Sequence, residues 1–307
     1  MLRSWAKRRA VLIVGVLAPA LAGHVPAQAG SPTAAQILNQ FNLVSSGGDS
    51  SQSDIEGNAV IGGTLSGNGT FFNNDVPANP AVSVYGSVSG TGISLDAGGN
   101  LHAPSAPGPG RINFNGGGTY IGAAAQPLSS YTTTLSTLSG SLAGLTRNSG
   151  IVDSNGTANF DAVAGSDGLA VFKLTAKALQ RDLNGQSNVQ FNIGSGVTGV
   201  IVDVKGNFTE PGGLNWNGTP QRDVLFNFSN ATKVTVGNWE ASVLAPKATV
   251  GITGGGALNG TLVAANFTGG GELHNFTYSG ALPVPEPGML PAFGAVLAGL
   301  ALLRRRR

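Results

Sequence analysis

The chain has no cysteine and few charged residues. Charged side chains make up 10% of its 307 positions, against about 25% in an average protein. Without cysteine there is no disulfide, thiolate metal site or Cys nucleophile, so an exported protein of this sequence depends on packing and hydrogen bonds for its stability. The low charge excludes a solvated coiled coil, and a hydrophobic content of 41% argues against a charge-driven disordered chain.

Glycine, by contrast, is abundant, with 48 glycines and 16 prolines. The glycines follow no Gly-X-Y period, so the chain is not collagen. They cluster as GG, GNG and NGGG between short apolar runs, a pattern typical of short strands joined by tight turns. The composition therefore predicts a folded, mainly β protein.

The first 29 residues have the pattern of a secretory signal peptide. Basic residues at positions 3 and 7–9 precede the apolar segment 10–22, which is short for a membrane span. Ala27 and Ala29 form a small-x-small cleavage site, so we expect signal peptidase to cut before Gly30. An uncleaved N-terminal anchor is the alternative.

The last 24 residues resemble a PEP-CTERM sorting signal. Its parts, in order, are a short motif, an apolar stretch over 289–303 and four terminal arginines; the motif is Val284, Pro285, Glu286 and Pro287. Fifteen helical residues cover about 22 Å, less than a hydrocarbon core of about 30 Å. The resemblance implies a transient inner-membrane anchor, cleavage by an exosortase-type protease, and delivery to the surface or matrix of a Gram-negative-type bacterium. A plain tail-anchored membrane protein is the alternative.

Residues 30–283 form the predicted mature domain. The excess of basic over acidic residues in the whole chain comes from the two ends, and the domain itself carries net negative charge. A domain of that sign repels phosphate backbones, so we expect no nucleic-acid partner.

Apolar spacing predicts a helix over 127–145 and shorter helices at 32–41 and 175–183. Runs rich in Val, Ile, Leu and Phe predict strands, among them 59–61, 82–85, 112–114, 158–160, 169–174, 197–204, 224–228, 233–236, 241–245, 248–250, 258–263 and 272–276. Their continuous spacing and small corner residues favour a right-handed β-helix, or solenoid, with one inserted helix alongside. A β-sandwich is the alternative.

Two blocks of the domain resemble the choice-of-anchor A family, adhesive domains of bacterial surface proteins. The first block runs from Phe41 to Gly63 and contains Ser53-Asp54-Ile55-Glu56-Gly57; the second runs from Val224 to Gly280 and contains Leu258-Asn259-Gly260-Thr261-Leu262. Members carry alternative C-terminal surface signals, PEP-CTERM among them. The family is similar to β-helical ice-binding-like adhesins, so the resemblance implies the same fold.

Asp49, Asp54 and Glu56 are candidate oxygen ligands for Ca²⁺. On a strand, Asp54 and Glu56 face one side and Ile55 the other. The same carboxylates suit glycoside hydrolysis, and turn hydrogen bonding is the structural alternative. We expect no other cofactor.

Aromatic side chains are candidate platforms for sugar rings. Trp216, in a polar loop, is the strongest candidate, and Tyr85 and Tyr120 are further ones; buried, all three would fill the core instead. Glu272 and His274 share a strand face, but no nucleophile accompanies them and no GxSxG, HExxH or Walker loop occurs.

The sequence thus predicts a non-enzymatic, exported adhesive protein that binds polysaccharide, protein or a surface through a rigid β face. One rival is ice binding, which needs a regular threonine face; the threonines are scattered along the sequence, with 233–253 the most regular stretch. The other rival is a polysaccharide-degrading enzyme.

Overall fold

The computed structural model describes residues 31–50, 52–71, 81–217, 221–253 and 255–283. The predicted signal peptide with its cleavage site, and the predicted sorting tail from Val284 onward with its apolar segment, lie outside the described residues. The structure therefore concerns the predicted mature domain.

All three predicted helices are confirmed, and their first turns follow from local sequence. The helices are α1 (Ala34–Gln40), α2 (Ser129–Ala143) and α3 (Ala176–Leu183). At α1, Thr33 and Gln36 exchange side-chain-to-backbone hydrogen bonds in a capping box. Among the described residues, no helix combines the length and apolar character that a membrane span requires.

The described residues contain twenty strands, so this part of the chain is mainly β, as predicted. They are β1 (Phe41–Ser45), β2 (Asn58–Ile61), β3 (Thr70–Phe71), β4 (Val82–Val84), β5 (Ile93–Leu95), β6 (Leu101–His102), β7 (Ile112–Phe114), β8 (Gly150–Ser154), β9 (Thr157–Ala162), β10 (Leu169–Thr175), β11 (Asn188–Ile193), β12 (Gly199–Lys205), β13 (Phe208–Thr209), β14 (Asn215–Trp216), β15 (Gln221–Asn227), β16 (Lys233–Val236), β17 (Ala241–Ile252), β18 (Ala257–Asn259), β19 (Leu262–Gly269) and β20 (Glu272–His274).

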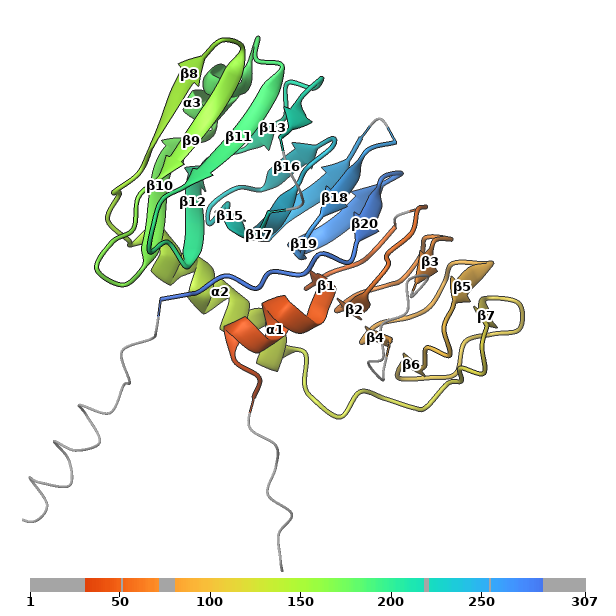
Figure 1. Cartoon of the computed structure of the whole chain (residues 1–307). Helices are drawn as coiled ribbons and strands as arrows, with labels where there is room; N and C mark the ends of the chain where they lie inside the picture. Colours follow the sequence, from red (N-terminus) through yellow and green to blue (C-terminus); the bar gives the residue numbers. More distant parts are fainter. Residues whose placement is uncertain (1–30, 51, 72–80, 218–220, 254, 284–307) are drawn as a thin grey trace, which may run out of the picture. The chain divides into compact units, whose positions relative to one another are not determined.

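The strand order of the largest sheet departs from the order of the chain. Along its main path the order is β10-β12-β15-β17-β19-β1-β2-β4-β6, with parallel pairing throughout. The first strand, β1, therefore lies in the middle, where Leu43 pairs with both Leu262 and Ala59. The chain builds one end of the sheet as far as β6 and crosses through α2 towards the opposite end, which β10 forms (Figure 1). From β10 it returns strand by strand to β19, which lies beside β1.

Two further rows of parallel pairing accompany this sheet. One joins β13, β16 and the second halves of β17 and β19, and continues through bridges at Asp49, Leu65 and Val88. The other includes β9, β11 and β14, the pair β18–β20, and β3, β5 and β7. Parallel pairing of this kind is not that of a β-sandwich, whose sheets are antiparallel.

The antiparallel exception among the described strands is the β8–β9 hairpin. Its turn is Asn155-Gly156, with φ of 50° and 74°. Both residues are left-handed, which is the requirement of a type I′ hairpin turn and the reason Asn-Gly is favoured there. This hairpin was not predicted, although its Asn-Gly signal is present in the sequence.

Three of the predicted runs are divided differently in the structure. The runs 241–245 and 248–250 form one long strand, β17. The run 258–263 divides into β18 and β19 because the chain turns at Gly260, where an added Cβ would lie 2.8 Å from the Ala241 backbone.

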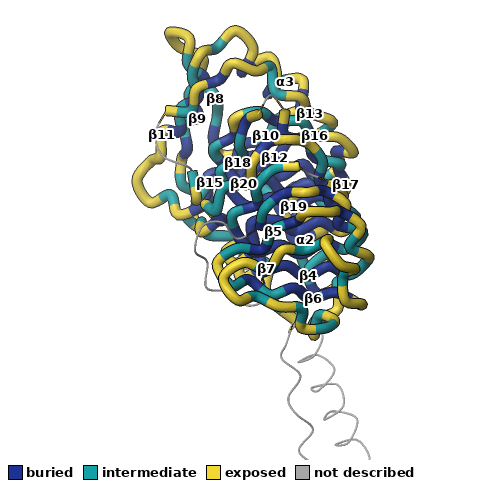
Figure 2. The backbone as a smooth tube through the Cα atoms, turned by 90° about the vertical axis from the view of Figure 1, so that its right-hand side faces the viewer, coloured by how far each residue is buried: buried dark blue, intermediate teal, exposed yellow. Residues whose placement is uncertain are grey.

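The strands bury two apolar clusters. The larger fills the interior between the rows and includes Trp239, Phe226 and Phe267. The smaller lies between the largest sheet and the helices α1 and α2, and includes Leu135 and Leu244. Figure 2 shows the strands as the buried part of the molecule and the connecting turns as its exposed part.

Candidate functional site

The row of β13, β16, β17 and β19 buries a line of side chains that lie in register across the strands. The residues in register along this row are Phe208, Val234, Val250, Phe267, Asp49, Leu65 and Val88. All except the half-buried Val88 are at most 2% exposed. Because side chains alternate along a strand, the residues on either side of this row point outward.

The outward side chains form two lines across the strands, and nearly all are small and polar. The line after the buried row is Thr209, Thr235, Gly251, Thr268, Ser50, Ser66 and Ser89. The line before it is Lys233, Thr249, Asn266, Gly48, Thr64 and Ser87. We call the surface made by these two lines the threonine face; the sequence shows no such array because its members are far apart along the chain.

Strand geometry fixes the spacing of the hydroxyl groups on the threonine face. Neighbouring parallel strands lie about 4.8 Å apart, and residues two apart on one strand about 6.6 Å. Neighbouring side chains in a line can touch, as Thr64 and Ser87 do, with their hydroxyl oxygens 3.2 Å apart. Threonine is stiff about χ1, so its hydroxyl and methyl groups are held in place before any ligand binds.

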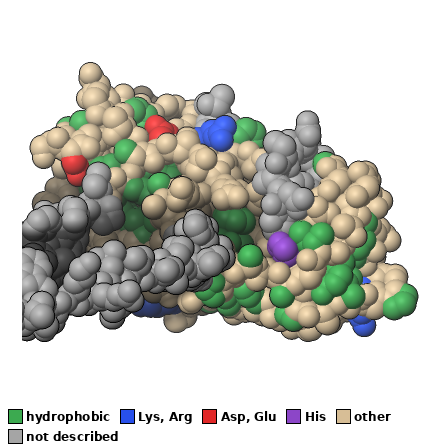
Figure 3. Space-filling model, turned by 90° about the horizontal axis from the view of Figure 1, so that it is seen from below, with side chains coloured by type: hydrophobic (Ala, Val, Ile, Leu, Met, Phe, Trp, Pro, Cys, Tyr) green, Lys and Arg blue, Asp and Glu red, His purple; other side chains and the backbone are tan. Residues whose placement is uncertain are grey.

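Charge is sparse on this face and on the rest of the surface. Lys233 is the one ionisable residue in the two lines, which belong to the described part of the chain. The side seen in Figure 3 is likewise dominated by uncharged polar side chains and backbone. The threonine face therefore presents mainly uncharged hydrogen-bonding groups.

The three candidate calcium ligands do not meet. Asp49 is 1% exposed and belongs to the inward row behind the threonine face. Asp54 and Glu56 lie on another row, on either side of the buried Ile55, as their spacing predicts. Among the residues that the structure describes, no group of three His, Cys, Asp or Glu side chains is placed to hold a metal.

Trp216, the candidate aromatic platform, turns towards the interior. Trp216 is half-buried and packs into the interior cluster, with its ring centroid 4.8 Å from that of Trp239 and 6.1 Å from that of Phe191. The polar loop around it misled the prediction because β14 turns its indole inward, level with Val189 of β11.

Tyr85 and Tyr120 are half-buried and lie away from Trp216. Tyr85 packs beside α2 and donates a hydrogen bond of 2.6 Å to the Gln126 carbonyl. Burial, with a smaller contribution from Tyr131, raises its pKa to about 12. Tyr120, next to β6, packs against the interior cluster instead and donates to the Ala103 carbonyl over 3.2 Å. The three aromatic side chains therefore form no shared surface.

Glu272 and His274 do meet, as their spacing predicts. His274 Nε2 lies 2.9 Å from a Glu272 carboxylate oxygen. Its other ring nitrogen lies 2.5 Å from Asn259 Oδ1, and Asn259 in turn donates to Glu240 over 2.5 Å. The interactions link side chains of neighbouring strands and stabilise this row.

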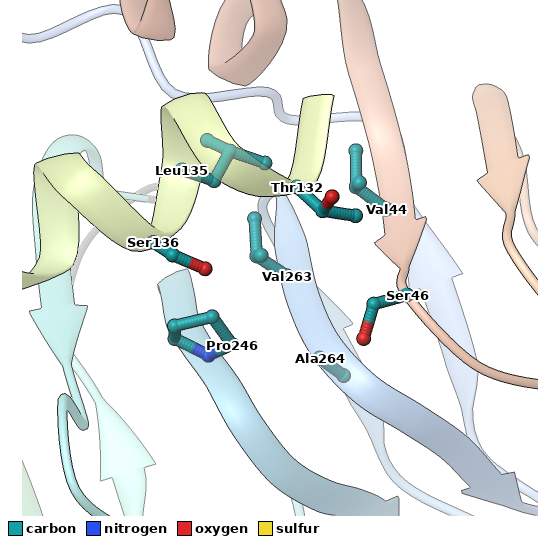
Figure 4. A pocket seen from close by; sticks show the side chains of 8 residues that line it. All are labelled: Val44, Ser46, Thr132, Leu135, Ser136, Pro246, Val263 and Ala264. Atoms are coloured by element: carbon teal, nitrogen blue, oxygen red, sulfur yellow. The ribbon is translucent and has the colours of Figure 1, made fainter. Parts of the chain in front are cut away.

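A small hollow of about 40 Å³ lies between α2 and the largest sheet (Figure 4). Thr132, Leu135 and Ser136 of the helix line one side, and Val44, Val263 and Pro246 line the other. Its volume suits one or two waters rather than a ligand.

Parallel strands that carry a hydroxyl-rich outer face define the class of protein: a β domain built to display a binding surface. A family model described as "Putative Ice-binding-like adhesive domain" matches residues 34–275. The chain belongs to this family, which confirms the expected adhesive class and agrees with a surface or extracellular location. Comparison with curated proteins and with solved structures finds no match.

Proposed function

We propose that the protein is a non-enzymatic surface or matrix adhesin that binds polysaccharide through the threonine face. In this proposal the parallel rows are the sides of a right-handed β-solenoid. The observation that carries it is the alignment of small hydroxyl side chains from distant parts of the chain on one face. Membership of an adhesive-domain family supports the same function.

Binding would come from many weak contacts held in a fixed geometry. A hydrogen bond contributes about 0.5–1.5 kcal/mol net, so one Thr or Ser hydroxyl gives little affinity. Several such bonds along a repeating polymer add up, because the first contact raises the effective concentration of the next sugar. The stiff strands lower the entropy cost of ordering the binding groups.

The route to the surface is also part of the proposal. The segment 1–29 would direct export and be removed by signal peptidase. The motif at 284–287 with the apolar segment 289–303 would act as a PEP-CTERM signal that an exosortase-type protease processes. The order of these segments, and the resemblance to the choice-of-anchor A family, support this route.

The test measures retention of the purified protein on immobilised neutral polysaccharides. Replacing Thr235 and Thr268 together by Tyr places two large rings on the face, and Tyr suits a strand; we expect at least tenfold weaker retention. The matched control is Thr157→Tyr on β9, which leaves the threonine face unchanged. Equal retention of both variants, or turnover of the polysaccharide, would contradict the proposal.

Gly251 offers a variant that should strengthen binding. It interrupts the line between Thr235 and Thr268, and an added Cβ would lie 3.6 Å from the Thr268 carbonyl oxygen, an ordinary contact. Gly251→Thr therefore extends the line of hydroxyls without crowding. We expect retention equal to or above that of the wild type, whereas a decrease would show that the line is not the contact surface.

Ice binding is the second candidate, favoured by the regular spacing of the same face. An ice surface also presents a lattice of hydrogen-bonding groups, which a fixed grid of hydroxyl and methyl groups can match. Growth of ice crystals in the presence of the wild type and of the Thr235→Tyr/Thr268→Tyr variant distinguishes the candidates. Inhibition that only the wild type shows, without polysaccharide retention, would establish ice as the ligand.

A further inference from the structure

A second concave site lies at the corner between the threonine face and the next row of strands. Its volume is about 280 Å³, near the lower end of the range for small-molecule sites. Residues that follow three strands of the row line it: Glu210, Gly212, Gly213 and Leu214 after β13, Gly237 and Asn238 after β16, and Thr253, Gly255 and Gly256 after β17.

Glycine makes this corner hollow. Gly237 and Gly256 stack so closely that a Cβ at Gly256 would lie 2.6 Å from the Gly237 carbonyl carbon. Gly212, Gly213 and Gly255 have φ of 81°, 70° and 67°, which L side chains rarely adopt. The cavity wall is therefore mostly backbone, so peptide groups are within reach of a bound ligand.

Among the described residues that line the cavity, Glu210 is the one that carries a carboxylate, and none is Lys or Arg. One of its oxygens accepts a hydrogen bond from the Gly237 N–H. No hydrogen bond to its second oxygen is seen among the described residues. Burial raises the pKa of Glu210, and the Gly237 hydrogen bond partly offsets that rise.

These features select the chemistry of the ligand. A carboxylate oxygen and backbone carbonyls accept hydrogen bonds, so the ligand has to donate them, as hydroxyl or ammonium groups do. Leu214 is the apolar residue among the described lining residues, and most of it packs in the interior cluster. An anionic ligand would face Glu210 without a compensating cation.

We propose that this corner cavity binds one sugar ring, neutral or amino-substituted, whose hydroxyl or ammonium group donates to Glu210. The choice of a saccharide as ligand rests on the proposed adhesion to polysaccharide. The cavity would recognise an end or a side branch of the polysaccharide chain, in addition to the contacts that the threonine face makes. A single carboxylate is not the pair used in glycoside hydrolysis, so the site would bind the sugar without cleaving it.

The test titrates the purified full-length protein with glucose, glucosamine and glucuronate, followed by calorimetry and by NMR. We expect binding of glucose and glucosamine and none of glucuronate. Glu210→Gln keeps the shape of the side chain, and we expect at least tenfold weaker binding, the scale of one charge-assisted hydrogen bond. No binding by the wild type, or glucuronate bound as well as glucose, would overturn the proposal.

A second pair of variants separates the cavity from overall folding and from the threonine face. Thr253 is exposed at the cavity rim, so Thr253→Trp should fill the cavity and abolish sugar binding, whereas Thr253→Ser should preserve it. The Thr235→Tyr/Thr268→Tyr variant should bind the sugars normally. If the Thr235→Tyr/Thr268→Tyr variant lost sugar binding, the assignment of the sugar site to the corner cavity would be wrong. Retention of the same variant on polysaccharide is measured separately, so each of the two proposals can fail without the other.

Discussion

Asn227 is the residue whose removal should most weaken the attachment of α2 to the largest sheet. It lies at the end of β15, is 0% exposed, and uses its whole amide group. Its nitrogen donates to the Ser139 carbonyl over 3.0 Å and to Asp203 Oδ1 over 2.8 Å, while its oxygen accepts from the Ser139 hydroxyl over 2.6 Å. One buried side chain thus joins the helix to two strands.

Asn227→Ala should lower the free energy of unfolding because it leaves buried polar groups without their hydrogen-bond partner. A buried polar group without its partner costs about 1–3 kcal/mol, and the Asp203 carboxylate and the Ser139 hydroxyl would both lose theirs. We therefore expect a loss of about 3–5 kcal/mol in the free energy of unfolding. Ser139→Ala removes one partner without stranding a charge, so its expected cost is about 1–2 kcal/mol.

The assay is urea unfolding at pH 7, followed by circular dichroism. Asn227→Asp adds a specific test: it keeps the size of the side chain but sets a second carboxylate against Asp203. Its deficit should be large at pH 7 and shrink as falling pH protonates one of the pair. A loss below about 1 kcal/mol for Asn227→Ala, or a pH-independent deficit for Asn227→Asp, would refute this account of the network.

Three further changes probe the same framework. Burial raises the pKa of Asp203, so folding favours the neutral form of its carboxyl group. The free energy of unfolding of the wild type should therefore rise as the pH falls through that raised pKa. Urea unfolding at several pH values measures this rise, which Asp203→Asn should remove. Gly260→Ala places a Cβ 2.8 Å from the Ala241 backbone, and we expect a loss of about 1–3 kcal/mol in thermal unfolding. At Gly156 an added Cβ would meet no atom within 4 Å, but the residue has a φ of 74°. Gly156→Ala should therefore cost only backbone strain of about 1–2 kcal/mol, measured as increased hydrogen exchange in the β8–β9 hairpin.

The helices and most strands could be predicted from the sequence because their signals are local. Leucines at spacings of three and four gave α2, and Thr33 and Thr175 cap α1 and α3 through hydrogen bonds to residues three positions on. Strand runs such as 233–236 were found with the observed bounds. In each case the deciding interactions lie within a few residues.

The position of β1 and the threonine face depend on pairing between distant residues, and no local pattern reveals them. Leu43 pairs with Leu262, which lies more than 200 positions away along the chain. Thr209 and Ser89 end the same line although α2 and several strands separate them. Only the register of every intervening strand brings such residues together.

Trp216 and the candidate carboxylates show that neighbours in sequence need not share an environment. Trp216 sits among polar residues, yet strand alternation turns it inward while Asn215 and Asn217 point outward. Asp49 and Asp54 are close in sequence, yet the chain passes from one row of strands to the next between them. A turn between rows separates side chains that spacing alone would group.

The threonine face exists only when both halves of the chain are in place. Ser50, Ser66 and Ser89 come from the first half, and Thr235 and Thr268 from the second. The two sets meet at the bridge between Asp49 and Phe267, just beyond the pairing of β1 with β19. A slip of one residue there would turn hydroxyls inward and apolar side chains outward. Because α2 connects the halves and Asn227 fastens it to the sheet, the buried polar network helps maintain the alignment that the proposed adhesion requires.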